Sequence, residues 1–257
     1  MTVHFIGAGP GAADLLTLRA VRLIGQSPVC VYAGTYLDAE ILQHCPDGAT
    51  LVDSQHLDLD EIAAVLIAAQ ARGEDVARLC SGDPSLYSAV AEQTRRLDRA
   101  GVPWDITPGV PAYAAAAAVL GRELTVPEVA QTVILTRTYG ASTPMPESES
   151  LGRLAQSRAT LVLHLAIRQV RRLCGELTAA YGEDCPAVVV ANASRPNQQV
   201  LRGTLADLAD QVEVAGLRQA AVIMVGEALR PDEFVESHLY GRRQRQRGTD
   251  EIVPRGD

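Results

Sequence analysis

Two strand-and-turn segments in the first ninety residues constrain what this chain can fold into. The apolar run Val3–Ile6 leads into Gly7-Ala8-Gly9-Pro10-Gly11, and the run Val76–Cys80 leads into Ser81-Gly82-Asp83-Pro84. A buried strand that ends in a Gly/Pro-rich turn brings backbone and a few side chains to the edge of a sheet. In an open α/β sheet, the carboxyl ends of the strands form the edge where small ligands bind. The two segments therefore predict an α/β protein with a ligand site built from these turns.

Strand and helix patterns alternate through the first 120 residues. Expected strands lie at 3–6, 29–32, 76–80 and 104–107, and expected helices at 15–24, 58–73, 87–100 and 112–120. Asp58 and Glu61 have the spacing of a capping box, and Gly73 is placed to end the helix that they begin. This alternation predicts a mostly parallel sheet with helices on both faces.

The second half of the chain changes character. Expected strands lie at 132–136, 161–165, 187–191, 199–201 and 221–225, with a helix at 168–181 and a capped helix that begins at Thr204 and Asp207. Two of these strands are joined by the turn Asn192–Asn197, which favours an antiparallel or mixed sheet, and we expect a mixed one. We therefore expect two α/β domains, at 1–120 and 126–241, followed by a polar, Arg-rich tail at 242–257 that we expect to be disordered.

Composition excludes several classes of protein. No apolar run reaches the ~18 residues of a membrane span, and the N-terminus is already strand-like rather than a leader, so we expect a cytoplasmic protein without a membrane segment. The net charge is −8, which argues against a nucleic-acid partner. Five cysteines lack metal-ligand spacing, so we expect reduced structural thiols and no metal site.

The first turn also fits a dinucleotide-binding fingerprint, because Gly7, Gly9 and Ala12 match G-x-G-x-x-G/A. That fingerprint expects an acid at the end of the second strand, where the segment Val29–Gly34 has none. Pro10 also removes an N–H from the turn. A dinucleotide-dependent oxidoreductase and a tight turn without a ligand therefore both stay open as alternatives.

The turn motifs, together with Pro108-Gly109-Val110 and Gly203-Thr204-Leu205, resemble those of the tetrapyrrole (corrin/porphyrin) methyltransferase family, and the resemblance covers about residues 3–240. Four further segments are similar to its precorrin-4 C11-methyltransferase branch: Val31–Gly34, Leu124–Glu128, Gln131–Arg137 and Thr143–Glu147. The chain departs from that branch at Ala33–Leu37, Ser54–Leu57 and Gly109–Ala112.

The resemblance implies the class III methyltransferase fold, with two α/β domains, an active-site cleft between them and a homodimeric assembly. It implies S-adenosylmethionine as methyl donor and S-adenosylhomocysteine as product. Carried over by position, the cofactor contacts are Pro10, Gly82, Asp83, Leu86, Pro111, Ala112, Leu165, Ala193 and Ala220. Asp83 is the one charged side chain among them, and the alternative for it is a turn-initiating role before Pro84.

The implied reaction is methylation of C11 of precorrin-4, which gives precorrin-5 on the route to cobalamin. The alternatives within the family are cobalt-precorrin-4, another corrin carbon, or uroporphyrinogen III, and a catalytically silent binding protein is a further one. The chemistry depends mainly on alignment in a dry site. The sequence identifies no catalytic base, although His56, Tyr113 and Tyr139 are candidates.

The implied substrate carries many carboxylates, which calls for arginine partners. We expect Arg137 and Arg195 to bind the tetrapyrrole, with Tyr113 and His56 beside it. Arg78 lies in a strand pattern that is otherwise apolar, and its role stays open.

Overall fold

The computed structural model describes residues 1–34, 37–138 and 144–230. Tyr36, Tyr139, the first residue of Thr143–Glu147 and the expected tail at 242–257 lie outside these residues. The chain divides into two compact units. Met1–Gly121, Val190–Val200 and Leu217–Val222 form the first unit, and the second begins with Arg122–Val189 and Leu201–Gly216 and resumes at Ile223.

The sheet of the first unit is parallel throughout. Its order is β3 (Thr50–Asp53), β2 (Val29–Tyr32), β4 (Val76–Cys80), β1 (Val3–Gly7) and β5 (Trp104–Thr107). The strand pairing places Ile6 beside Leu79 and Thr107. All five strands therefore end at one edge, where the two Gly-rich turns also lie.

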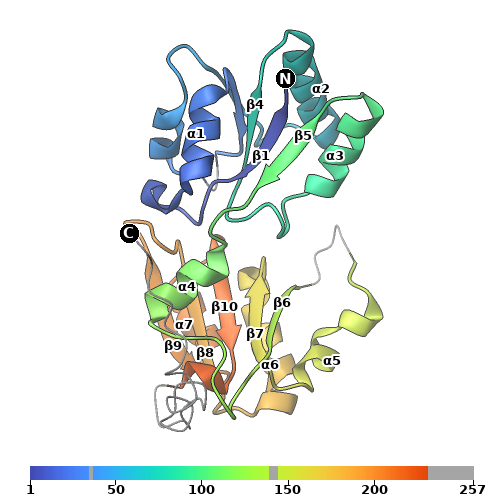
Figure 1. The fold of residues 1–257 in the computed structure, drawn as a ribbon. Coiled ribbons are helices and arrows are strands. Elements are labelled where there is room, and N and C mark those ends of the chain that lie inside the picture. Colours follow the sequence, from blue (N-terminus) through green and yellow to red (C-terminus); the bar gives the residue numbers. More distant parts are fainter. Residues whose placement is uncertain (35–36, 139–143, 231–257) are drawn as a thin grey trace, which may run out of the picture. The chain divides into compact units, whose positions relative to one another are not determined.

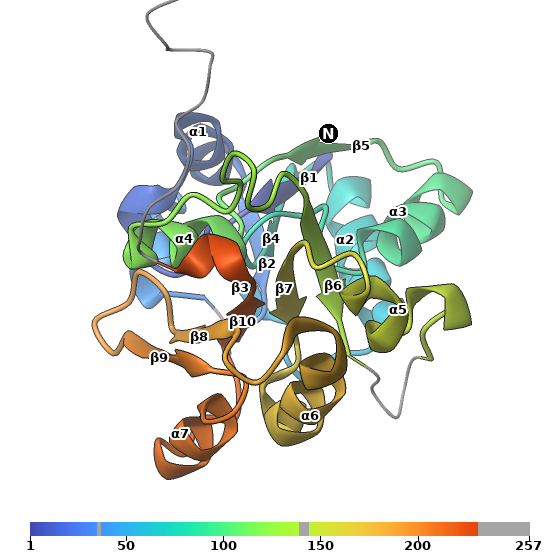
Figure 2. The ribbon, with the colours of Figure 1, turned by 90° about the horizontal axis from the view of Figure 1, so that it is seen from below.

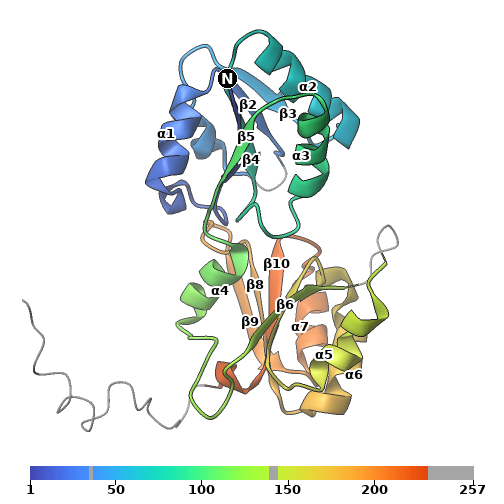
Figure 3. The ribbon, with the colours of Figure 1, turned by 45° about the vertical axis from the view of Figure 1, so that its right-hand side comes forward.

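Helices cover both faces of this sheet (Figures 1 and 3). On one face, α1 (Leu18–Gln26) packs Ala20 and Ile24 against Ile6, Ala77 and Leu79. On the other, α2 (Leu59–Ala71) and α3 (Val90–Arg99) pack against alternate residues of the same strands, including Phe5 and Val76. Because the strands are buried on both faces, they read as nearly continuous apolar runs.

The second sheet is mixed, as expected. Its order is β6 (Val133–Arg137), β7 (Thr160–His164), β10 (Ala221–Val225), β8 (Pro186–Ala191) and β9 (Gln199–Thr204). Strands β6 and β7 are parallel, whereas β7 and β10 are antiparallel. Helix α6 (Val170–Tyr181) packs between α5 (Leu151–Ala155) and α7 (Leu208–Val214), as Figure 2 shows from below.

Several elements differ from the sequence expectation. Strand β3, helix α5 and the short turns of 3-10 helix at Ala39–His44 and Glu147–Glu149 were not expected. Helix α3 begins at Val90 instead of residue 87, because Tyr87 and Ala89 have positive φ values of 54° and 50°. The capping box of Asp58 and Glu61 is confirmed.

The capped start expected at Thr204 and Asp207 is wrong in its detail. Helix α7 begins at Leu208, and the side chain of Asp207 does not cap it. That carboxylate instead accepts a hydrogen bond from the Thr204 N–H at 2.6 Å, ahead of the helix.

The described residues contain neither a membrane-spanning helix nor a cluster of metal ligands. None of their helices is long and apolar enough to cross a membrane. None of their His, Cys, Asp and Glu side chains forms a group of three that could hold a metal ion. All five cysteines are free thiols, and Cys30 and Cys45 belong to one apolar cluster beside α1.

Candidate functional site

Three glycines bring the ends of β1, β4 and β5 into backbone contact. A Cβ on Gly7 would lie 2.6 Å from Cα of Gly109 and 2.9 Å from the carbonyl oxygen of Gly82, which is closer than real side chains approach. A Cβ on Gly109 would overlap the same carbonyl and the backbone of Gly7. These positions therefore need glycine because of close approach, whatever the ligand. We call the set Gly7, Gly9, Gly82, Asp83 and Gly109 the glycine edge.

Hydrogen bonds join the first two turns. The Gly82 N–H donates to the Gly9 carbonyl at 2.7 Å, and the Gly9 N–H donates back to Gly82 at 3.2 Å. Gly9 and Gly82 have φ values of 73° and 69°, a conformation that favours glycine. The turn after β1 does not open directly into α1, because a short 3-10 helix at Ala13–Leu15 comes first. In a dinucleotide site the glycines open a helix, so this geometry disfavours that alternative.

Asp83 joins the second turn to the third. Its Oδ2 accepts the Gly109 N–H at 2.9 Å, and its Oδ1 accepts the Ser85 N–H at 2.9 Å and the Ser85 hydroxyl. Partial burial works to raise the pKa of Asp83, but the hydrogen bonds from Ser85 and Gly109 outweigh it and the pKa is lowered. The carboxylate is therefore ionised at neutral pH and already has a structural task in the turn.

Other predicted cofactor residues surround the glycine edge. Gly82 lies against Pro111 and Ala112, since a Cβ there would be 3.6 Å from Cα of Pro111 and 3.5 Å from N of Ala112. Pro111 is the N-cap of α4 (Ala112–Leu120), and no described side chain caps this helix start. The Leu86 N–H donates to the Asp83 carbonyl at 3.2 Å. Five predicted contacts thus meet around one turn, namely Gly82, Asp83, Leu86, Pro111 and Ala112.

The turn Asn192–Asn197 belongs to the same unit and lies against the first turn. The Ser194 hydroxyl accepts the Ala12 N–H at 3.1 Å, and the Arg195 side chain packs on Gly11, where a Cβ would lie 2.6 Å from Arg195 Cγ. Ala193 is buried within this turn. Sequence reasoning missed Ser194, because its partner is 182 positions away in the chain.

Ala220 reaches the same place through the backbone. Its carbonyl accepts the Asn192 N–H at 2.8 Å. Asn192, Ser194 and Ala220 all have positive φ values, of 50°, 69° and 52°. Non-glycine residues rarely hold this conformation, and such outliers cluster where surrounding structure and function require them.

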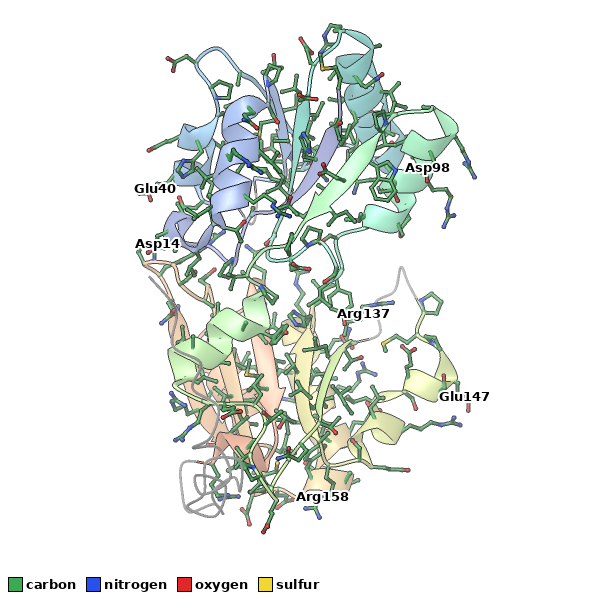
Figure 4. All side chains as sticks on the ribbon, viewed as in Figure 1. Asp14, Glu40, Asp98, Arg137, Glu147 and Arg158 are labelled. Atoms are coloured by element: carbon green, nitrogen blue, oxygen red, sulfur yellow. The ribbon has the colours of Figure 1, made fainter. Side chains whose placement is uncertain are left out.

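The second unit carries a smaller edge, at the carboxyl ends of β6 and β7. Arg137 and His164 are register partners there, and Thr138 and Leu165 follow them. Leu165, a predicted cofactor contact, is 68% exposed and has a φ of 53°. Figure 4 shows Arg137 at this end of the unit and Arg158 at the opposite end. We call Arg137, Thr138, His164 and Leu165 the β6–β7 edge.

His164 is a second residue that sequence reasoning missed. Burial lowers its pKa from the ordinary value of 6.5, so the imidazole is neutral at neutral pH. The only sequence signal was its position at a strand end, since its pairing with Arg137 requires knowledge of which strands are neighbours. The hydroxyl of Thr138 is buried and has no hydrogen-bond partner among the described residues.

The remaining predicted residues lie elsewhere on the first unit. His56 is exposed and follows β3. The pKa of the nearby Asp53 carboxyl is lowered mainly by hydrogen bonds from the Gln55 and Gly34 N–H groups, and His56 adds a smaller effect in the same direction. Tyr113 is half-buried in the first turn of α4, beside the predicted contact Ala112. The structure thus brings Arg195 to the glycine edge and places Arg137 in the other unit.

Comparison with known proteins gives consistent results. A profile of the Tetrapyrrole (Corrin/Porphyrin) Methylases matches residues 2–209. A precorrin-4 C(11)-methyltransferase of Rhodococcus erythropolis is 58% identical over 240 residues, which cover 93% of this chain and 96% of that one.

Two solved structures extend the comparison. A cobalt-precorrin-4 methyltransferase of cobalamin biosynthesis superposes with a TM-score of 0.87 at 37% identity, covering 90% of this chain and 96% of the other. A uroporphyrin-III C-methyltransferase of Thermus thermophilus, in complex with S-adenosylhomocysteine, gives 0.75 at 27% identity and covers 90% and 99%. These structures share the architecture of both units.

Proposed function

Because this chain belongs to the tetrapyrrole (corrin/porphyrin) methylase family, we propose that it transfers a methyl group from S-adenosylmethionine to C11 of precorrin-4, which gives precorrin-5 in cobalamin biosynthesis. The observation that carries the proposal is the 58% identity to a relative named for this reaction, over nearly the whole of both chains. Identity falls to 37% for the structure named for the cobalt-containing substrate.

The glycine edge fits S-adenosylmethionine in its chemistry. The ionised carboxylate of Asp83 suits a hydrogen bond from an ammonium group or a ribose hydroxyl. The start of α4 has no side-chain cap, and helix starts favour a negatively charged group. Gly82 and Gly9 are buried and hydrogen-bond each other, so they fix the backbone of the two turns that would face the ligand. We therefore assign cofactor binding to Pro10, Gly82, Asp83, Leu86, Pro111, Ala112, Leu165, Ala193 and Ala220.

When bound, the donor supplies a methyl group on a positively charged sulfur, which is already a strong electrophile. The protein's task is to hold the reacting carbons close together and in line, and to keep water away. Residues held by interlocked backbone hydrogen bonds suit that task, because little motion is left to them once the chain is folded. The overall reaction forms a C–C bond, breaks a C–S bond and releases a proton from the macrocycle.

Arginines supply the recognition of the substrate in this proposal. The acetate and propionate groups of the tetrapyrrole need cationic partners, since the net charge of −8 repels a polyanion. Arg195 lies beside the first turn. Arg137 is the last residue of β6, and its register partner His164 directly precedes Leu165, a predicted cofactor contact. We assign both to substrate binding, together with Tyr113 and His56. A proton acceptor is not assigned.

We also propose a symmetric homodimer that works in the cytoplasm. The family resemblance supports the dimer, and twofold dimers are the commonest oligomers of soluble proteins. Light scattering on the full chain should give twice the monomer mass, and cell fractionation should recover the protein with the cytosol. A monomer, or recovery with membranes, contradicts the respective proposal.

The deciding experiment incubates the protein with S-adenosylmethionine and, in parallel, precorrin-4, cobalt-precorrin-4 or uroporphyrinogen III. We expect one added methyl group on precorrin-4, located at C11 by NMR, and slower turnover of the others. Calorimetric titration should show saturable binding of S-adenosylhomocysteine and none of NAD. Preferred turnover of cobalt-precorrin-4 would move the assignment to that substrate, and NAD binding without S-adenosylhomocysteine binding overturns the methyltransferase proposal.

A further inference from the structure

Arg78 is a buried cation in the centre of the first unit. It lies in β4 between β1 and β2, where the neighbouring positions are apolar, and only 8% of its surface is exposed. Its side chain belongs to the face that α2 and α3 cover, since Val76 and Cys80 lie in that apolar cluster.

The hydrogen-bond partners of Arg78 among the described residues are all neutral. Nε donates to Gln93 Oε1 at 3.0 Å, and Nη1 donates to Ser54 Oγ at 3.1 Å and to the Val31 carbonyl at 3.5 Å. Nη2 makes no hydrogen bond within residues 1–34, 37–138 and 144–230. Arg78 also has no ion pair with any acid of that part of the chain.

The nearby thiols do not supply the missing negative charge. Burial raises the pKa of Cys80 to about 11, and it raises that of Cys30 further, so both are protonated at neutral pH. Burial also lowers the pKa of Arg78 itself, although a guanidinium keeps its proton. A charged group taken out of water is strongly unfavourable unless an opposite charge compensates it. A carboxylate from outside the chain would provide that compensation.

The side chain extends toward the edge where the ligand turns lie. Arg78 shares a rung of the sheet with Val31, which pairs in turn with Val52. Ser54, which accepts from Nη1, is two residues further along the chain direction, beyond the end of β3. The guanidinium thus lies toward the carboxyl ends of the strands, the same edge that carries Gly82 and Asp83.

The acids of this edge are already committed to backbone groups. Asp53 accepts the N–H groups of Gly34 and Gln55, at 3.1 and 2.9 Å. Asp83 accepts those of Gly109 and Ser85. Neither forms an ion pair with Arg78. Within the described part of the chain, the edge therefore pairs its anions with N–H donors and leaves the buried Arg78 without an anion.

We propose that Arg78 binds a carboxylate side chain of the tetrapyrrole substrate, as an anion subsite beneath the glycine edge. The proposal rests on the function proposed above, which supplies a substrate rich in carboxylates. Gln93 and Ser54 hold the plane of the guanidinium, so its remaining N–H groups are fixed before the ligand arrives. An arginine suits this task better than a lysine, because its planar fork bonds both oxygens of a carboxylate.

Gln93 offers a variant that leaves Arg78 in place. It is 1% exposed, and its Nε2 donates to the Ala89 carbonyl at 3.1 Å. In Gln93→Glu, a carboxylate would stand next to Nε and pair with Arg78 inside the protein. If Arg78 serves a ligand carboxylate, this internal partner competes with it. If Arg78 only supports the fold, tetrapyrrole binding is indifferent to the change.

The experiment compares wild type, Arg78→Lys, Arg78→Met and Gln93→Glu, with Arg96→Met as the control. Arg96 is an arginine of α3 whose side chain pairs with Asp60 at 2.6 Å, outside the glycine edge. Three quantities are measured: KM for precorrin-4, the Kd of uroporphyrin III by fluorescence quenching, and the Kd of S-adenosylhomocysteine by calorimetry. Melting temperatures report the fold.

For Arg78→Met and Gln93→Glu we expect both tetrapyrrole constants to rise about tenfold or more, the loss of one charge-assisted contact. Arg78→Lys should fall between these and wild type, and Arg96→Met should match wild type. The Kd of S-adenosylhomocysteine should stay within about twofold throughout. If Arg78→Met does not fold, Arg78→Lys and Gln93→Glu still decide the question.

Unchanged tetrapyrrole constants with a lowered melting temperature overturn the proposal and make Arg78 a structural residue. A parallel loss of S-adenosylhomocysteine affinity also overturns it, because Arg78 then acts by positioning the turn after β4. Failure of the proposed function is a separate result: the wild type then methylates no precorrin-4, while the uroporphyrin titrations still report whether a carboxylated macrocycle needs Arg78.

Discussion

The two candidate edges of this protein are built by different means. At the glycine edge, three strand ends touch through their backbones, and hydrogen bonds between Gly9 and Gly82 lock the turns together. At the β6–β7 edge, the register brings side chains of different chemistry next to each other, among them Arg137 and His164. At the glycine edge, the backbone contacts leave no room for a Cβ on Gly7 or Gly109. At the β6–β7 edge, the contacts are made by side chains, which other side chains could replace.

This difference separates two tasks of a methyl-transfer enzyme. A rigid backbone surface suits a small ligand that every member of a family must hold in one way. Side chains at strand ends suit a substrate that differs between members, since changing them leaves the fold intact. We therefore predict that substitutions at the glycine edge lower both the stability of the protein and its function. Substitutions at the β6–β7 edge should change only substrate binding and the pH dependence of stability.

The largest effect should come from Gly109→Ala. The added Cβ overlaps the Gly82 carbonyl and lies 2.8 Å from the backbone of Gly7, so strand ends must move apart. We expect the free energy of unfolding to fall by about 3 kcal/mol, the upper part of the range for overpacking, and S-adenosylhomocysteine binding to be lost. Urea unfolding and calorimetry measure the two.

Gly175→Ala is the matched control for that change. Gly175 lies inside α6, and nothing stands within 4 Å of a Cβ there. Alanine should stabilise the helix by about 0.5–1 kcal/mol and leave binding unchanged. If Gly109→Ala behaves like Gly175→Ala, the interlocked backbone is not what holds the glycine edge together.

Asp83→Ala should give the next largest effect. If the carboxylate bonds the cofactor, S-adenosylhomocysteine affinity should fall by about 1.5–3 kcal/mol. If it only braces the turn through Gly109 and Ser85, stability falls and affinity holds, and Asp83→Asn, which keeps one acceptor oxygen, should be milder. Calorimetry and urea unfolding on both variants distinguish the two roles.

The lowered pKa of Asp83 also predicts how the stability of the protein depends on pH. A depressed carboxyl pKa contributes stability above the ordinary value of 3.8, and that stability is lost as pH falls through the lowered pKa. Asp83→Asn should therefore lose less stability than wild type between neutral pH and strongly acidic pH. Parallel acid-unfolding curves for the two proteins would show that the carboxylate has no such role.

The two substrate arginines should respond differently from each other. Arg137→Ala should lower kcat/KM for precorrin-4 about tenfold and leave S-adenosylhomocysteine affinity unchanged. Arg195→Ala should lower both, because the Arg195 side chain also packs on Gly11 of the first turn. Lysine should rescue neither fully, and added salt should reduce wild-type activity. Normal methylation by both alanine variants at limiting substrate would falsify this assignment of the carboxylate-binding residues.

The smallest effect should come from His164→Gln. Because burial depresses its pKa below 6.5, the neutral imidazole contributes stability that is present above pH 6.5 and is lost as pH falls through the lowered value. Wild type should therefore lose stability between pH 7.5 and 5.5, and His164→Gln should lose less. Urea midpoints at the two pH values measure this. Equal losses would mean that His164 is not buried enough to matter.

The sequence by itself determined the local features of this protein. Apolar runs that end in Gly/Pro turns gave the strands β1 and β4 and their edge, and the spacing of Asp58 and Glu61 gave the start of α2. These features depend on interactions between residues a few positions apart, so a reading of neighbours is enough. Beyond them, the resemblance to a family supplied the function and the proposed cofactor residues.

Only the tertiary structure decided which distant residues meet. The pairing of Arg137 with His164, the contact of Ser194 with Ala12 and the set of neutral partners around Arg78 depend on strand order and register. The sequence does not predict strand β3, because its four residues contain no long apolar run. A charged residue in an apolar strand is visible in the sequence. Whether an acid lies beside that residue is decided by packing, because the residues around it come from strands and helices far away in the chain.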